Sequence, residues 1–279
     1  MTNITRYNGR TDRRLSNRLW QEAWREMDRN DPSSHHFDFD DFTNFPQHVS
    51  DQDTQKYSTY IDTGVTLKQK STLDLGNSKG VVRGELEVAG NDADNDEGSI
   101  QVGGNTGPEV VISDTGGENK LLVFEARICK ASVDDNALAF AIGLAEPGKA
   151  GANALVDNTG EIADMDFIGF QVLHADGEIV KAVYRKAGQT KQVVAATALT
   201  MEAGVYYKLG FVYDPNESAD YRIKFFVDNV DIGSYVTATN IAEATFPDGE
   251  ALSRIFATKV GAAAESKAQM DWWGIFQSN

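Results

Sequence analysis

The sequence has a single cysteine among its 279 residues, and this scarcity excludes an intramolecular disulfide. Cys129 ends the strand-like run Leu121–Cys129, so we expect a small buried side chain rather than a reactive thiol. A chain of this length buries enough apolar surface to fold without cross-links. The missing disulfides indicate assembly in a reducing cytoplasm.

Long apolar runs are missing as well. No stretch reaches about 18 apolar residues, so no transmembrane helix and no membrane partner are expected. The N-terminal sequence MTNITRYNGRTDRR lacks the apolar segment of a signal peptide. The glycines of GGNTGPEVV are not followed by a helical pattern, so they do not form a phosphate-binding loop, and no nucleophile elbow occurs.

Basic residues are few, 26 against 42 acidic ones, and the net charge is −16. The charge is uneven, because residues 1–30 carry seven arginines and no lysine against four carboxylates. An acidic body repels phosphate backbones, so no nucleic-acid partner is expected. The arginine-rich arm suits carboxylates on a protein surface, and a solvated helix face explains it equally well.

An amphipathic helix is predicted over LSNRLWQEAWREMDR, where apolar residues recur every four positions and two tryptophans widen the stripe. Pro32 ends it. No second helix follows, so the stripe must pack on the rest of the chain or on another protein. The distinct charge of the arm favours another protein. The predicted contact residues are Arg13, Arg14, Leu15, Leu19, Trp20, Trp24 and Met27.

From residue 35 onward the sequence has the period of β-strands. HHFDFDDF alternates Phe37 and Phe39 with aspartates and slips at Asp41–Phe42, as a bulged strand does. About a dozen β-branched and aromatic runs follow at intervals of roughly ten residues, separated by turn signals such as EPGKAG and DPNESAD. The pattern predicts one antiparallel sandwich over residues 35–279, preceded by an arm over residues 1–34.

The segment VYYKLGFVYDPNESADYRIKFFVDNVDIGSYV resembles concanavalin A-like lectin/glucanase domains, including the laminin-G branch. It reads as a strand, a polar turn and the hairpin FFVDNVDIG, in which Asp228 and Asn229 tolerate left-handed geometry. The resemblance implies an all-β jelly roll in which the C-terminal MDWWGIFQ pairs near HHFDFDDF. More narrowly, FDFDDF, DFIGFQVLHADGEIVKAVYRKAGQTK and DWWGIF resemble tailed-phage virion proteins with such a sandwich.

Catalytic residues are not evident. The glucanases of this superfamily carry E-x-D-x-x-E on one strand, with the two glutamates as nucleophile and acid/base. The nearest stretch runs from Glu161 through Asp164 to Asp166; it has its acidic residues at other positions and lacks the second glutamate. We therefore expect a protein that is not an enzyme.

Two weaker candidate sites remain. Asp92, Asp94 and Asp96 offer oxygens to calcium, but the loop departs from the EF-hand pattern and a solvated acidic loop is favoured, so no cofactor is expected. Trp272 and Trp273 are adjacent, so on a strand one should face the core and the other solvent or a partner. An exposed tryptophan stacks on a sugar or fills a protein pocket; packing of both by neighbouring loops is the alternative.

The favoured hypothesis is a virion structural protein assembled in the host cytoplasm. It would be a decoration, or cement, protein on the capsid exterior, attached to the major capsid protein or another virion protein through its arm, with a homo-oligomer as a further expectation. Deleting residues 1–34 should then leave a folded domain that no longer attaches. The alternative is a lectin-like module of a phage head or tail fibre that binds a host glycan.

Overall fold

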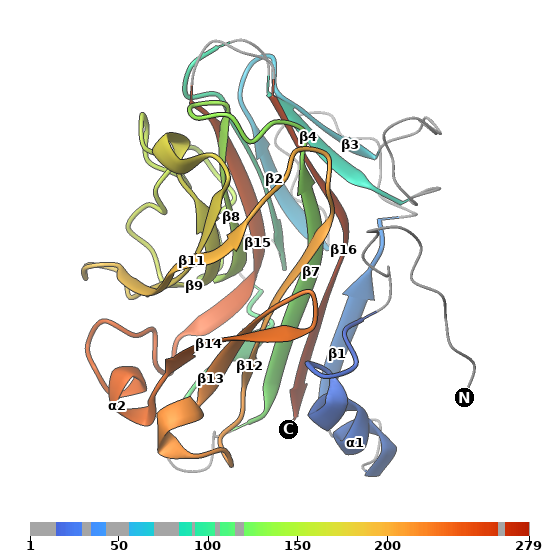
Figure 1. Ribbon diagram of the computed structural model, residues 1–279, viewed down its shortest axis with the longest axis vertical. Coiled ribbons are helices and arrows are strands. Elements are labelled where there is room, and N and C mark those ends of the chain that lie inside the picture. The colour runs from blue at the N-terminus through green and yellow to red at the C-terminus, as the bar shows by residue number, and fades with distance from the viewer. Residues whose placement is uncertain are drawn as a thin grey trace.

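The computed structural model describes residues 15–29, 35–42, 56–69, 84–90, 93–103, 107–114, 120–261 and 266–278. Most of these residues lie in antiparallel strands that form two sheets packed face to face (Figure 1). The predicted all-β sandwich is therefore confirmed. No helix in these ranges is long and apolar enough to cross a membrane.

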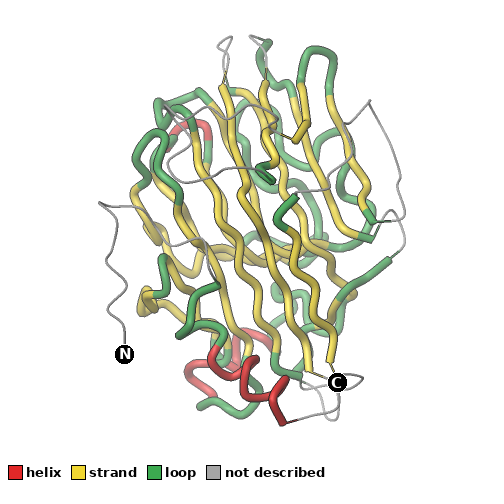
Figure 2. The backbone as a smooth tube through the Cα atoms, turned by 90° about the vertical axis from the view of Figure 1, so that its right-hand side faces the viewer, coloured by secondary structure: helices red, strands yellow, loops and turns green. Residues whose placement is uncertain are grey.

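The first sheet, called sheet A, has the strand order β14-β13-β12-β7-β16-β4-β3, and β1 also pairs with β16. Its strands are β1 (His35–Asp40), β3 (Thr66–Gln69), β4 (Leu86–Gly90), β7 (Leu122–Lys130), β12 (Tyr207–Tyr213), β13 (Ile223–Val227), β14 (Val230–Val236) and β16 (Ser266–Ser278). The long β16 pairs with β4 along one half and with β1 along the other. Figure 2 shows these strands running side by side.

The second sheet, called sheet B, has the order β11-β10-β9-β8-β15-β5-β2, with β6 also on β15. Its strands are β2 (Tyr57–Ile61), β5 (Glu97–Val102), β6 (Val110–Val111), β8 (Leu138–Ala145), β9 (Phe167–Val172), β10 (Ile179–Arg185), β11 (Gln192–Thr200) and β15 (Ala251–Val260). The helical segments are α1 (Gln21–Arg29), α2 (Ala238–Ile241) and the 3-10 turns η2 (His174–Asp176) and η3 (Ala219–Tyr221).

The core lies between the sheets and follows from the alternation of each strand. Leu209, Phe211 and Tyr213 of β12 are fully buried and belong to the same cluster as Ile142 of β8 and Phe170 of β9. Because successive side chains of a strand point to opposite faces, every second residue reaches this layer. Burial of apolar surface here is the main stabilising contribution.

The pairing of the first and last strands agrees with the sequence prediction. β1 runs antiparallel to β16, with His35 opposite Ser278 and Asp40 opposite Trp273. The predicted bulge at Asp41–Phe42 is wrong. The strand instead ends at Asp40, and Phe42 takes a left-handed φ of 56° and turns its buried ring into the core.

The predicted hairpin FFVDNVDIG is confirmed. Asp228 and Asn229 form a two-residue turn between Val227 and Val230, which face each other across β13 and β14. Their φ values are 48° and 69°. This left-handed pair matches the right-handed twist of the flanking strands, and Asn and Asp adopt it at low cost.

Candidate partner-binding surface

The apolar stripe of the arm packs on the outer face of sheet A. Leu19, Trp20 and Ala23 are buried there and form one cluster with side chains of the sheet. The sheet contributes Leu121, Val123, Phe226 and Phe276 to this cluster. Figure 1 shows α1 beside β1 and the end of β16. The sequence-based preference for another protein as the partner of this stripe is wrong for Leu19, Trp20 and Ala23, because the sandwich itself buries them.

Trp20 is fixed by a hydrogen bond as well as by packing. Its indole Nε1 donates to Glu125 Oε2 at 2.9 Å, and the backbone N–H of Ser16 donates to the same oxygen at 3.0 Å. Glu125 lies on β7 and is buried, and this burial raises the pKa of its carboxyl group. The two donors hold the start of the helix at one position on the sheet.

Two glycines allow this close approach. A Cβ on Gly210 would lie 2.6 Å from a methyl carbon of Leu19, and a Cβ on Gly274 would lie 3.2 Å from the Trp20 ring and 3.4 Å from the Phe39 ring. These glycines lie on β12 and β16. Larger side chains there would lift the helix and β1 off the sheet.

Three aromatic side chains remain exposed around this anchor. The exposed fractions are 40% for Trp24, 39% for Phe37 and 39% for Phe39. The Trp20 ring lies 5.9 Å from both Trp24 and Phe37. We call the exposed residues Trp24, Phe37 and Phe39 the α1–β1 surface, and the buried rings of Trp20 and Trp272 lie beneath it. Exposed aromatic rings that cluster on buried ones are typical of a binding surface.

The other side of β1 is held by charged contacts. Asp38 pairs with the guanidinium of Arg254, which also pairs with Glu109 at 2.7 Å, and Asp40 pairs with Lys56 at 2.9 Å. Arg254 is fully buried. Burial opposes ionisation of Glu109, but its contacts with Arg254 outweigh this and lower its pKa to about 2. These contacts point the aspartates inward, so Phe37 and Phe39 face outward.

The tryptophan pair of β16 is buried. Trp273 lies in the core, with the Arg254 guanidinium 5.1 Å from its ring. Trp272 is only 1% exposed and packs 5.7 Å from Phe39. The expectation that one of the two faces solvent or a partner is wrong, because β1 covers the outward-facing tryptophan.

The structure therefore joins two sites that the sequence predicted separately. The ring of Phe39 connects Trp272 to the surface around the arm. Leu15 and Met27 are half-buried against the helix cluster, and Trp24 is exposed. Arg13 and Arg14 lie outside the described residues. Sequence reasoning missed Phe37 and Phe39 as site residues, although their alternation with aspartates was the available signal.

The weak calcium candidate gains no support. Asp94 is exposed and Asp96 is half-buried, and Asp92 lies outside the described residues. In the described part of the chain, no three His, Cys, Asp or Glu side chains gather so that they could hold a metal ion.

The stretch that loosely resembles a glucanase pattern lies in the loop between β8 and β9. There Glu161 pairs with Lys191, Asp164 accepts from the backbone of Gly188 at 2.7 Å, and Asp166 accepts from the backbone of Ala187 at 2.8 Å. Each carboxylate thus holds the loop to β10 or to the turn after it.

No protein-family model matches this sequence, and no curated protein matches it. Several solved structures, however, are similar to this chain. A protein of unknown function from Shewanella oneidensis MR-1 is 12% identical, with a TM-score of 0.54 over 88% of this chain and 87% of that one. A pseudo beta-1,3-glucanase and immunostimulatory antigen of Mycobacterium tuberculosis is 11% identical, with a TM-score of 0.52 over 87% and 98%.

Peanut lectin is 11% identical, with a TM-score of 0.50 over 88% of this chain and 97% of the lectin. At such identities the likeness establishes the fold alone. The chain has the concanavalin A-like sandwich that lectins and glucanase-like proteins share.

Proposed function

We propose that this chain is a non-enzymatic structural protein of a virion, a decoration protein that binds the major capsid protein through its α1–β1 surface. The observation that carries the proposal is the grouping of three exposed aromatic side chains, Trp24, Phe37 and Phe39, over buried aromatic rings. Aromatic residues in such positions dominate protein–protein binding energies. The sandwich then forms an acidic body on the capsid exterior.

The role of the arm changes in this proposal. Its buried stripe holds the helix to the sandwich, and among the described residues of the arm Trp24 is an exposed aromatic side chain available to a partner. Deleting residues 1–34 would uncover Leu121, Val123 and Phe276. The expectation that this deletion leaves a well-folded domain is therefore revised, and point substitutions are the better test.

The proposal of a non-enzymatic role rests on the acidic residues of the β8–β9 loop. Glu161, Asp164 and Asp166 are each held by a contact with β10 or the turn after it. Retaining glycosidases instead need two free carboxyl groups about 5 Å apart on either side of the substrate. In this loop a lysine, an arginine or a backbone N–H engages each of the three carboxylates instead.

The test is a co-sedimentation assay with capsids assembled without this chain. The variant replaces Trp24, Phe37 and Phe39 by serine in the full-length protein. The matched control replaces Val193 and Val230, which are 50% and 60% exposed elsewhere, by serine. We expect the aromatic variant to bind at least about 100-fold more weakly, because hot-spot side chains each contribute about 2 kcal/mol. Equal binding of the aromatic and control variants would overturn the proposal.

A second candidate function is binding of a host glycan, and the lectin-like fold favours it. The exposed rings of Phe37 and Phe39 would stack on sugar faces. A glycan array probed with the wild-type chain and the aromatic variant, with and without calcium, separates the two functions. A glycan that binds the wild-type chain but not the aromatic variant would favour the lectin role. If the wild-type chain binds no sugar on the array, the result would count against that role.

A further inference from the structure

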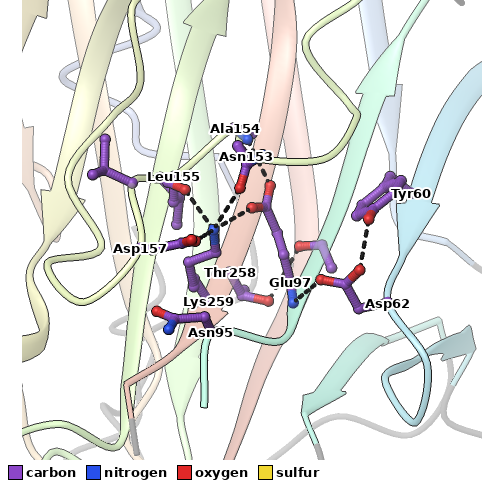
Figure 3. A network of polar contacts seen from close by, with 12 residues as sticks. Tyr60, Asp62, Asn95, Glu97, Asn153, Ala154, Leu155, Asp157, Thr258 and Lys259 are labelled. Carbon is purple, nitrogen blue, oxygen red and sulfur yellow. Dashed lines mark hydrogen bonds and ion pairs between the residues drawn. The ribbon is translucent and has the colours of Figure 1, made fainter. Parts of the chain in front are cut away.

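The ammonium group of Lys259 lies among four oxygen atoms at one end of sheet B (Figure 3). Its Nζ is 2.6 Å from the carbonyl oxygen of Leu155, 2.6 Å from Asp157 Oδ1, 3.0 Å from Glu97 Oε2 and 3.4 Å from Asn153 Oδ1. We call these four oxygen atoms the oxygen cage. They comprise two carboxylates, one amide and one backbone carbonyl.

The cage is assembled from distant parts of the chain. Lys259 of β15 and Glu97 of β5 are directly opposite each other on neighbouring antiparallel strands. The other three oxygens come from alternate residues of the β8–β9 loop, so one short segment presents all of them. The backbone N–H of Ala154 donates to Glu97 Oε1 at 2.8 Å, and Asp62 Oδ2 accepts from the backbone N–H of Glu97 at 2.9 Å. Contacts outside the cage therefore hold Glu97 in place and tie it to the loop segment that supplies the other three oxygens.

The charges in the cage are largely withdrawn from water. The side chains of Lys259 and Glu97 are each 1% exposed, whereas that of Asp157 is 55% exposed. A buried ammonium requires close oxygen partners to offset its lost hydration. The partners found here are also the oxygen types that bind a hard cation such as Ca²⁺. The exposed side chain of Asp157 connects the cage to solvent.

We propose that the oxygen cage is a cation site that the chain fills with its own ammonium group, and that a free hard cation takes this place once the ammonium is removed. Two of the four distances, 2.6 Å each, fall at the upper end of the 2.3–2.6 Å of Ca²⁺–oxygen bonds, and the other two would shorten when the ion binds. Water would complete the six to eight ligands of Ca²⁺, whereas Mg²⁺ requires a regular set of six at about 2.0–2.1 Å. In the wild-type chain, Lys259 thus makes the position of the β8–β9 loop independent of free cations. This site is separate from the α1–β1 surface.

The test uses the full-length Lys259→Ala variant at pH 8 and at pH 9, because Lys259 lowers the pKa of buried Glu97 and its removal raises that pKa further. Thermal unfolding is followed in EDTA, in CaCl₂ and in MgCl₂, and calcium binding is measured by calorimetry. We expect the wild-type midpoint to be the same in all three solutions. The variant should unfold earlier in EDTA, and saturating calcium should raise its midpoint by about 5 °C or more with one ion bound per chain.

The matched control is the double variant Glu97→Gln/Lys259→Ala, which lacks both the ammonium and one carboxylate of the cage. It should show no saturable calcium response. If Lys259→Ala alone fails to fold in EDTA, calcium during refolding should restore a folded chain. The proposal is overturned if calcium gives the single variant no more stability than EDTA or magnesium does, if refolding with calcium fails, or if the double variant binds calcium equally well.

Discussion

Trp20 and Glu125 are 105 residues apart in the chain and are joined by a hydrogen bond of 2.9 Å between two buried side chains. The tryptophan belongs to the arm and the glutamate to the central strand β7. This contact makes the arm part of the sandwich. It also means that buried and exposed residues of one short segment contribute to different properties, since Trp20, directly before α1, stabilises the fold while Trp24 within α1 is available to a partner.

Substitution of these two tryptophans should separate stability from binding. Trp20→Ala should lower the free energy of unfolding by about 3–5 kcal/mol, because it leaves a cavity and removes a partner of buried Glu125. Trp24→Ala should change it by no more than about 1 kcal/mol, because Trp24 is 40% exposed. Chemical denaturation of both variants measures the difference. Similar losses in both would show that the helix does not pack as described.

The glycines under the arm provide a second prediction. A Cβ on Gly210 would lie 2.6 Å from the carbonyl oxygen of Phe124, a backbone atom that cannot move aside easily. We expect Gly210→Ala to destabilise the chain by roughly 1–3 kcal/mol. The matched control is Gly151→Ala, where no atom lies within 4 Å of the added carbon, and this change should be neutral or slightly stabilising. Equal midpoints for the two variants would contradict the close approach.

The fold was predictable because its signals are local. Alternation identifies core residues such as Leu209 and Phe211, and the pair Asp228–Asn229 marks its turn without reference to the rest of the chain. These patterns depend on neighbouring residues, and hydrophobic burial along a strand follows its period of two. The sandwich class therefore follows from the sequence, although individual strand ends do not.

The candidate site was predictable only in part, because its geometry depends on long-range pairing. Alternation along the strand predicts that Trp272 or Trp273 points away from the core. Only the register of β1 on β16 shows that Phe39 covers Trp272. The oxygen cage is a similar case. Lys259 reads as an ordinary polar strand position and Glu97 as part of the acidic loop that follows Asp92, and their pairing appears only when β15 and β5 are aligned.

A buried ion pair on the outer face of sheet A provides a third prediction. Arg127 Nη1 lies 2.6 Å from Asp271 Oδ2, both side chains are at most 1% exposed, and the Tyr206 ring lies 4.3 Å from the guanidinium. Arg127→Met alone should lower the free energy of unfolding by about 3–5 kcal/mol, because it removes the cation that pairs with the buried carboxylate of Asp271. The double variant Arg127→Met/Asp271→Asn should recover part of that loss. A double-mutant cycle with no coupling energy would show that the pair does not act together.

The acid–base behaviour of Glu97 provides the last prediction. Burial raises its pKa from 4.5 to about 7, although the nearby Lys259 acts in the opposite direction. Between these two pH values the folded chain binds the proton more tightly than the unfolded chain does. The contribution of Glu97 to stability is therefore greatest below pH 4.5 and is lost as the pH rises to 7, by about 3 kcal/mol in total.

Glu97→Gln removes this titration. Other buried carboxyl groups titrate in both chains, so the quantity to measure is the difference in unfolding free energy between variant and wild type from pH 4.5 to 8, in EDTA. We expect this difference to move in favour of the variant by about 3 kcal/mol across that range. A difference that stays constant with pH would mean that Lys259 holds Glu97 ionised throughout, because the attraction between the two charges would then outweigh the cost of burying the carboxylate.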